Sequence, residues 1–146
     1  ANSDSHIGLP VISADMKLIE RDFLPFQKMA SFIPFGMTAH VVLPEVDDKP
    51  ITQSKKGIQL IRQKIGFDGL LITDAIEMKA LQGTLAEKAK LSLEAGCDLV
   101  CYCSGHNQEN PNLVEENTEV LKACRILSDK SMDRLLKVTQ VIQKKK

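Results

Sequence analysis

Residues 66–78 read Gly-Phe-Asp-Gly-Leu-Leu-Ile-Thr-Asp-Ala-Ile-Glu-Met, and this stretch decides the fold class. Its apolar run, Leu70 to Ile72, follows a glycine and precedes Asp74. A run that is apolar on both faces is typical of a strand in a parallel sheet covered by helices. Parallel α/β folds bind ligands beyond the carboxyl ends of their strands, so Asp74 lies where such a fold does its chemistry. The alternative interpretation is that Asp74 caps a following helix.

The composition is that of an ordinary globular domain and argues against several classes of function. The chain has 146 residues, of which 43% are hydrophobic and 26% charged, and its formal net charge is zero. This balance argues against a broad nucleic-acid-binding surface. No apolar stretch is long enough to cross a bilayer, and we find no signal peptide, so we expect a cytoplasmic protein with no membrane partner. The chain starts at Ala1 rather than Met, and we expect its true start to lie upstream.

The four cysteines are expected to be free thiols. Cys97, Cys101 and Cys103 flank or lie within an apolar run, and Cys124 follows in a helix. The paired Cys or Cys–His spacing of a zinc site is missing, so we expect no metal. Cys101 and Cys103 share one face of a strand, but we expect them to be too close in the chain and wrongly directed to bridge each other. Buried reduced thiols favour a cytosolic compartment.

Apolar periodicity and capping signals predict three strands separated by helices. Strands are expected near residues 35–39, 69–73 and 98–102. Helices are expected from a cap at Ser13, after Pro25, from Ser54 to Ile65, from Thr84 to a stop at Gly96, from Asn110 with Pro111, and from Ser128 or Ser131. Regular alternation indicates parallel strands joined by right-handed crossovers. Three strands are few for so many helices, so we interpret the chain as the carboxyl-terminal part of a larger α/β fold.

Two histidines are candidates for chemistry. Asp4 and His6 lie two residues apart in the amino-terminal loop, and an extended backbone would point both side chains the same way. The carboxylate could then orient and charge-stabilise the imidazole, or the pair could be part of an ordinary polar surface loop. His40 follows the first predicted strand, where a hydrogen-bonded structural histidine is the alternative to a site residue.

Four segments then occur in an order that resembles one enzyme family. They are residues 4–10 (Asp-Ser-His-Ile-Gly-Leu-Pro), residues 37–41 (Met-Thr-Ala-His-Val), residues 66–74 followed by Met78, and residues 95–99 (Ala-Gly-Cys-Asp-Leu). Together they resemble the β-N-acetylhexosaminidases of glycoside hydrolase family 3. The family fold is a (β/α)8 barrel, which implies helices on one side only of the three strands. The resemblance implies that the three strands are the sixth, seventh and eighth, and that residues 1–146 form a partial barrel domain without its N-terminal half.

The resemblance also implies a retaining mechanism without a cofactor. Asp74 resembles the nucleophile, and His6, oriented by Asp4, resembles the general acid/base in place of the usual second carboxylate. Met78 and His40 are candidates for lining the sugar pocket, although Met78 could equally be core packing. Cys97 and Asp98 match the family pattern and look structural. The chain departs from the pattern at Ala75, where the family commonly has a second Asp, and it lacks the family's Lys-His-Phe-Pro-Gly-His-Gly segment.

Three interpretations of function remain open at this point. The first is a cytoplasmic glycosidase that removes terminal N-acetylglucosamine from saccharides derived from peptidoglycan of the cell wall. The second is a non-catalytic barrel fragment that acts as an assembly or interaction module, with the missing N-terminal half of the barrel as its partner. The third is an unrelated α/β binding domain in which Asp74 is only a helix cap.

Overall fold

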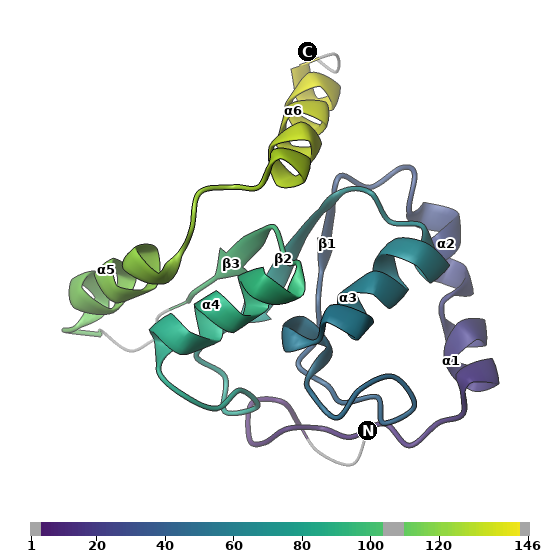
Figure 1. The fold of residues 1–146 in the computed structure, drawn as a ribbon, viewed down its shortest axis with the longest axis horizontal. Helices are drawn as coiled ribbons and strands as arrows, with labels where there is room; N and C mark the ends of the chain where they lie inside the picture. Colours follow the sequence, from purple (N-terminus) through teal and green to yellow (C-terminus); the bar gives the residue numbers. More distant parts are fainter. Residues whose placement is uncertain (1–3, 104–109, 144–146) are drawn as a thin grey trace.

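The sheet at the centre of the molecule has three parallel strands in the order β1-β2-β3. The computed structural model describes residues 4–103 and 110–143 (Figure 1). The strands are β1 (Phe35–Met37), β2 (Leu70–Ala75) and β3 (Leu99–Cys101). β1 pairs with β2 in a regular parallel register, Phe35 opposite Leu70. The predicted α/β class with three parallel strands is confirmed, although β1 and β3 are shorter than expected.

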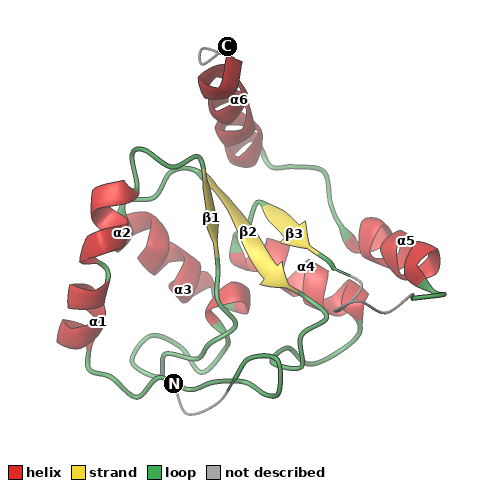
Figure 2. Cartoon of the chain, turned by 180° about the vertical axis from the view of Figure 1, so that it is seen from behind, coloured by secondary structure: helices red, strands yellow, loops and turns green. Residues whose placement is uncertain are grey.

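Helices follow the strands in the predicted alternation. They are α1 (Met16–Asp22), α2 (Leu24–Met29), α3 (Lys55–Leu60) after the 3₁₀ turn η1 (Ile51–Gln53), the π-helical turn η2 (Ile61–Ile65) that continues α3, α4 (Leu85–Ala95), α5 (Leu113–Ala123) and α6 (Asp129–Gln143). In both Figure 1 and Figure 2, α3 and α4 lie on one face of the sheet. The face turned toward the viewer in Figure 2 carries no helix of the described residues. This is the one-sided arrangement expected of a barrel wall.

Local capping chemistry explains where the helices begin. The Ser54 hydroxyl accepts from the Gly57 N–H at 2.9 Å, and Thr84 and Glu87 form the predicted capping box. The predicted cap at Ser13 is wrong. The carboxylate of Asp15 accepts from the Leu18 N–H instead, because the chain first turns into helix after Asp15.

Glycines end two of these helices, and the starts of α5 and α6 lie close to the positions predicted from the sequence. Gly66 (φ 74°) and Gly96 (φ 119°) take the left-handed conformation that terminates η2 and α4. Ser128, one of the two predicted caps of α6, accepts from the Ser131 N–H at 3.2 Å. The helix predicted from Asn110 begins three residues later, at Leu113.

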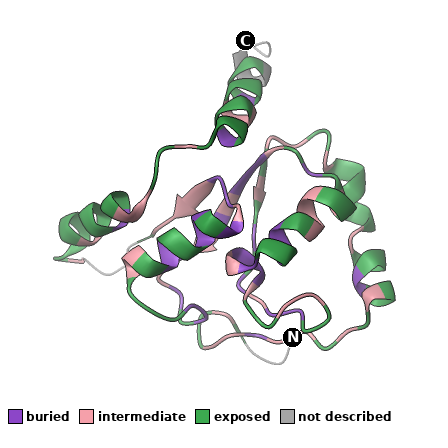
Figure 3. Cartoon of the chain, viewed as in Figure 1, coloured by how far each residue is buried: buried purple, intermediate pink, exposed green. Residues whose placement is uncertain are grey.

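The core lies between the sheet and its covering helices, where Figure 3 shows buried segments on β2, α3 and α4. The central cluster consists of Ile58, Phe67, Leu71, Ala95 and Cys97. The sheet edge and Phe67 approach so closely that a Cβ at Gly69 would lie 2.5 Å from the Phe67 ring and 2.6 Å from the Pro34 carbonyl. The glycine in front of the apolar run is therefore required for packing, not only for its turn.

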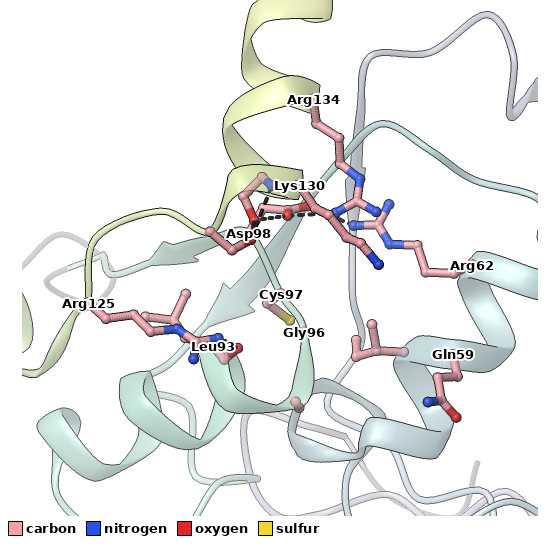
Figure 4. Close-up of a pocket in the computed structure, with 13 residues that line it drawn as sticks. Gln59, Arg62, Leu93, Gly96, Cys97, Asp98, Arg125, Lys130 and Arg134 are labelled. Carbon is pink, nitrogen blue, oxygen red and sulfur yellow. Dashed lines mark hydrogen bonds and ion pairs between the residues drawn. The ribbon is translucent and has the colours of Figure 1, made fainter.

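A buried ion-pair network ties α6 to the amino end of the sheet. Asp98, whose side chain is 1% exposed, accepts from Arg62 at 2.7 Å and from Arg134 at 3.1 Å. Its oxygens also accept from the Leu71 N–H at 2.9 Å and the Ser131 hydroxyl at 2.5 Å. Figure 4 shows Arg62 from η2 and Arg134 from α6 converging on this carboxylate. The four donors account for Asp98 as a structural residue, in agreement with the expectation from the sequence.

The edge of the sheet at β1 leaves apolar side chains in solvent. Among the described residues β1 pairs on one side only, and its side chains Phe35 and Met37 are 45% and 60% exposed. An apolar groove of about 640 Å³ opens beside them, between β1 and helices α1 to α3. Such exposure is what a strand without an outer neighbour would show.

Candidate active site

Asp74 lies in an irregularity at the carboxyl end of the central strand. Ile72 pairs with Leu99 and Ala75 with Cys101, so two residues of β2 stand against one residue of β3. The Cys101 N–H donates to the Thr73 hydroxyl at 2.8 Å, so a side chain of β2 takes part in the pairing with β3. Such bulges change the direction of a side chain at the end of a strand. The half-buried Asp74 is therefore set apart from the regular pleat of the sheet.

The backbone around Asp74 fixes its carboxylate without making it a helix cap. Its Oδ1 accepts from the Ala75 N–H at 2.8 Å, and no hydrogen bond to its Oδ2 occurs among the described residues. A turn follows, and the next helix, α4, has Thr84 as its cap. The alternative interpretation of Asp74 as a helix cap is therefore wrong, because the chain does not enter a helix there.

His40 is buried beside the same strand end, with both ring nitrogens in hydrogen bonds. Its ring is only 1% exposed. Nε2 donates to the Ala75 carbonyl at 3.0 Å, and Nδ1 lies 2.9 Å from the Thr52 hydroxyl, which also donates to the Ala39 carbonyl at 3.1 Å. The Thr38 and Thr52 hydroxyls are 2.9 Å apart and hydrogen-bonded, which completes a buried chain of polar groups. Burial lowers the pKa of His40, so its ring is neutral at neutral pH.

Met78 lies in the turn that follows β2, four residues after Asp74, and is largely buried, with 8% of its surface exposed. Its carbonyl is 3.5 Å from the Nζ of Lys88, a lysine on the buried face of α4. Burial lowers the pKa of Lys88, and the carboxylate of Glu77 opposes that shift. The Lys88 side chain thus lies against the turn that contains Met78 and contacts its backbone.

Asp4 and His6 form a hydrogen-bonded pair at the surface. Asp4 Oδ1 lies 2.9 Å from His6 Nδ1 and also accepts from the His6 N–H at 2.9 Å. These contacts to His6 lower the pKa of Asp4, the backbone hydrogen bond most. The predicted pairing is confirmed, but the predicted extended backbone is wrong. The Ile7 and Gly8 N–H groups both donate to the Asp4 carbonyl, so the segment is a turn closed by its own Asp side chain.

The amino-terminal segment that carries Asp4 and His6 lies at the same end of the sheet as Asp74. The Val42 N–H donates to the Pro10 carbonyl at 2.9 Å, which fixes the amino-terminal segment to the chain just past β1. Figure 1 shows this segment running along the lower edge of the molecule, toward which β1 and β2 point. Asp74, Met78 and His40 lie around the end of β2 itself. The Asp4–His6 pair belongs to the separate segment that runs past these strand ends.

Polar groups that the sequence did not single out complete the surroundings of Asp74. Thr73 and Thr52 hold the strand end through their hydroxyls, and Glu77 Oε2 lies 3.4 Å from the Cys103 N–H. Lys88 was recognisable in principle, because it falls in phase with the buried positions Ser92 and Ala95 of α4. Thr52 was not recognisable from the sequence, because it lies in a short 3₁₀ turn with no periodic signal.

A second hollow, of about 240 Å³, lies at the amino end of the sheet (Figure 4). Its lining is strongly basic and includes Arg62, Arg125, Lys130 and Arg134. Arg62 donates to Phe67 and Gly69 carbonyls as well as to Asp98, and Arg125 donates to the Leu93 carbonyl at 2.9 Å. Through these bonds, Arg62 and Arg125 link neighbouring structural elements to one another. In residues 4–103 and 110–143, no three His, Cys, Asp or Glu side chains are placed to hold a metal ion.

Comparison with known proteins identifies the family. Residues 1–141 match the Glycosyl hydrolase family 3 N terminal domain. The chain belongs to glycosyl hydrolase family 3. A β-hexosaminidase of Neisseria meningitidis is 38% identical over 121 residues, which cover 80% of this chain and 32% of that protein. A β-hexosaminidase of Thiobacillus denitrificans is 35% identical over 119 residues, with 78% and 32% covered.

Solved family 3 structures share the fold. A glycoside hydrolase family 3 β-N-acetylglucosaminidase from a Paenibacillus species superposes with a TM-score of 0.79 at 31% identity, covering 94% of this chain and 28% of that chain. NagZ from Neisseria gonorrhoeae, solved in complex with N-trifluoroacetyl-D-glucosamine, gives a TM-score of 0.67 at 29% identity and covers 92% and 37%. The family 3 chain described here therefore spans about a third of the length of the curated relatives it matches.

Proposed function

We propose that this chain carries the catalytic groups of a retaining glycoside hydrolase that removes terminal β-linked N-acetylglucosamine. The observation that carries the proposal is Asp74, held at the bulged carboxyl end of the central strand of a family 3 fold. The choice of sugar is supported by the names of relatives, which are β-hexosaminidases and β-N-acetylglucosaminidases. The resemblance in sequence suggests saccharides derived from peptidoglycan and action in the cytoplasm.

In the proposed reaction Asp74 is the nucleophile. One carboxylate oxygen attacks the anomeric carbon as the bond to the leaving oxygen breaks, which gives a glycosyl ester on the enzyme. The Ala75 N–H, 2.8 Å from Oδ1, orients the carboxylate. Water then attacks the same carbon, which releases the sugar and restores Asp74.

His6 is the proposed general acid/base. It protonates the leaving oxygen in the first step and takes a proton from water in the second. Asp4 Oδ1, 2.9 Å from Nδ1, holds the proton on that nitrogen and leaves Nε2 to exchange protons with substrate and water. An imidazolium beside an anionic nucleophile also avoids the repulsion that a second carboxylate would meet.

Met78 and His40 are proposed to support the sugar site in different ways. Met78 offers an apolar surface in the turn directly after Asp74. His40 is buried, so its proposed contribution is to hold the Ala75 carbonyl, and with it the direction of the strand end next to Asp74. It is a positioning residue in this scheme.

We further propose that the site is completed by the barrel strands that precede β1. The exposed edge of β1 and the apolar groove beside it are the surfaces that such strands and their helices would cover. The alternative, a non-catalytic assembly module, uses the same edge but no chemistry at Asp74. Activity distinguishes the two.

The test compares substrates with good and poor leaving groups. The chain is assayed alone and joined to the preceding part of a family 3 barrel, with an aryl N-acetylglucosaminide and with a natural disaccharide. His6→Ala should lower kcat/KM on the disaccharide by about 10²–10⁴-fold and much less on the aryl substrate, which needs little protonation. Asp4→Ala should give the same pattern more mildly.

Ser5→Ala is the matched control, because it alters the same turn and leaves both groups in place. Near-full activity of His6→Ala on the disaccharide would contradict its role as acid/base. If the completed enzyme hydrolyses neither substrate, the glycosidase proposal fails and the assembly module is favoured.

A further inference from the structure

Two cysteines meet at the carboxyl end of β3. Cys101 is the last residue of the strand and is half-buried, and Cys103, two residues on, is exposed. Their Sγ atoms lie 3.5 Å apart. The four cysteines are free thiols, but the sulfur atoms of Cys101 and Cys103 lie closer together than we expected from the direction of their side chains. The strand ends at Cys101, so the backbone beyond it is free of the pleat that would hold the two side chains parallel.

The other two thiols are in different surroundings. Cys97 is buried in the core, where its Sγ lies 3.6 Å from the Thr52 carbonyl. Burial raises its pKa to about 12, so it is inert at neutral pH. Cys124 packs at the margin of the cluster between α4 and α5. Within the described residues, Cys101 and Cys103 are the two cysteines whose sulfur atoms are in contact.

The thiol pair is joined directly to the strand end that carries Asp74. The Cys101 N–H donates to the Thr73 hydroxyl, and the Cys101 carbonyl accepts from the Ile76 N–H at 3.0 Å. The Cys103 N–H lies 3.4 Å from Glu77 Oε2. These three bonds bracket Asp74 on both sides in the sequence, so a movement of the Cys101–Cys103 backbone must change the bulge that sets its direction.

We propose that Cys101 and Cys103 form a reversible disulfide that switches the geometry at Asp74. The oxidant is a small disulfide such as glutathione disulfide. The exposed Cys103, as thiolate, attacks one sulfur of the oxidant and releases one glutathione thiolate. Cys101 then loses its proton to solvent and attacks Cys103 Sγ, which releases the second glutathione. Two thiols are oxidised to one disulfide, and one glutathione disulfide is reduced to two glutathiones.

Geometry makes this disulfide easy to reduce. An S–S bond is about 2.05 Å long, so closing the pair from 3.5 Å shifts the two side chains and pulls on the backbone after β3 that carries them. Strained and exposed disulfides are the labile ones, which suits a switch better than a structural bridge. Burial, followed by the contact with Cys103, raises the pKa of Cys101 to about 11, so little of it is thiolate at neutral pH and closure is slow.

The first experiment asks whether the bond forms. The full chain is equilibrated in glutathione redox buffers, alkylated and digested with trypsin. Fragment 91–122 contains Cys97, Cys101 and Cys103, and fragment 123–125 contains Cys124 as an internal control. The expected product is fragment 91–122 lighter by two hydrogen atoms, with Cys97 and Cys124 alkylated and full reversal by dithiothreitol.

Variants make the result specific. Cys103→Ser should leave Cys101 alkylatable in every buffer, and Cys97→Ala should leave disulfide formation unchanged. A stable glutathione adduct on Cys103 of the wild-type chain, or no oxidation in fully oxidising buffer, would overturn the proposal.

The second experiment asks whether the bond changes the site. Amide exchange over residues 72–78 should rise on oxidation of the wild-type chain and not of Cys103→Ser. The effect on hydrolysis rests on the proposed function, and we expect at least a tenfold reversible loss of kcat in the oxidised enzyme. Unchanged exchange in the oxidised chain would overturn the coupling to Asp74. Absent hydrolysis in the reduced enzyme would count against the glycosidase proposal and not against the switch.

Discussion

One histidine shows how much of the candidate site depends on residues that never meet a substrate. His40 is buried and hydrogen-bonded on both sides, to the Ala75 carbonyl and to Thr52. Ala75 stands where the family commonly has a second Asp, and here it contributes only backbone groups. Its N–H holds the Asp74 carboxylate and its carbonyl is held by His40. The Asp74 carboxylate is thus oriented by a main-chain N–H.

We expect His40 to make stability depend on pH. Its pKa is lowered by burial, so the unfolded chain binds more protons than the folded chain at mildly acidic pH. The stabilisation is present above about pH 6.5, the unfolded pKa, and is lost as the pH falls through the lower folded value. Urea titrations of His40→Gln should lack this loss, whereas His6→Ala should retain it because His6 is exposed.

His40→Ala should also cost about 1–3 kcal/mol of unfolding free energy for each buried partner left unpaired. A wild-type chain equally stable at pH 7 and pH 5 would contradict the account of a buried neutral ring.

Residue-level inference from sequence succeeded where partners are close in the chain. The spacing of Asp4 and His6 predicted their contact, although the turn that produces it was not foreseen. The partners of His40 could not be predicted, because Thr52 and Ala75 lie 12 and 35 residues away in the sequence. Only the packing of η1 and β2 brings them to the ring.

At the scale of elements, α6 is attached to the sheet through charge as well as apolar contact. Asp98 is almost fully buried and receives both Arg62 and Arg134, whereas Asp68, with a side chain 66% exposed, pairs with Arg134 and Lys137 at the surface. Contacts with Lys137 and Arg134 lower the pKa of Asp68, but solvent screens them. The two carboxylates contact the same arginine in different surroundings.

Asp98 and Asp68 provide a matched pair of substitutions. Asp98→Asn should lower the free energy of unfolding by about 3–5 kcal/mol, because it leaves two largely buried guanidinium groups without their shared anion. Asp68→Asn should cost about 0–1 kcal/mol. Urea denaturation followed by circular dichroism measures both. Equal effects of the two substitutions would contradict the structural role assigned to the buried network.

Helix ends were largely predictable from sequence, and strand irregularities were not. Capping depends on neighbours three or four residues away, so Ser54, Thr84 and Ser128 were recognisable. Ser13 failed because Asp15 is an equally good cap and lies nearer the apolar periodicity. The bulge at Asp74 depends on the register against β3, which the sequence of β2 alone does not contain.

At the scale of the molecule, the sheet has an open edge at β1 in the described structure. The β1 side chains Phe35 and Met37 are exposed, as is Phe32 before them at 76%. The groove beside β1 is lined almost entirely by apolar side chains. An open strand edge next to an apolar groove is a template for pairing with another chain.

We therefore expect the chain alone to self-associate. Met37→Lys places a charge on the open edge and should shift the molecule toward monomer in sedimentation velocity measurements. Leu136→Lys, on α6, removes a similarly exposed apolar side chain elsewhere and should change association little. A monodisperse wild-type monomer that melts cooperatively would contradict this expectation.

The class of fold was predictable at this scale because alternating apolar runs and helices admit few topologies. Periodicity alone does not distinguish a doubly wound sheet from a barrel wall. The helix-free face of the sheet, which appears only once the chain is folded, favours the barrel wall.

The central claim is that Asp74 forms the covalent bond to the sugar, and trapping that bond tests it most directly. The completed enzyme is incubated with a fluorinated N-acetylglucosaminyl substrate whose glycosyl-enzyme ester hydrolyses slowly, and is then digested with trypsin. Fragment 65–79 contains Asp68, Asp74 and Glu77. We expect fragment 65–79 to carry one sugar, located on Asp74, in the wild-type and Glu77→Gln enzymes and none in Asp74→Asn. A sugar on another carboxylate, or turnover of the substrate by Asp74→Asn, would contradict the account.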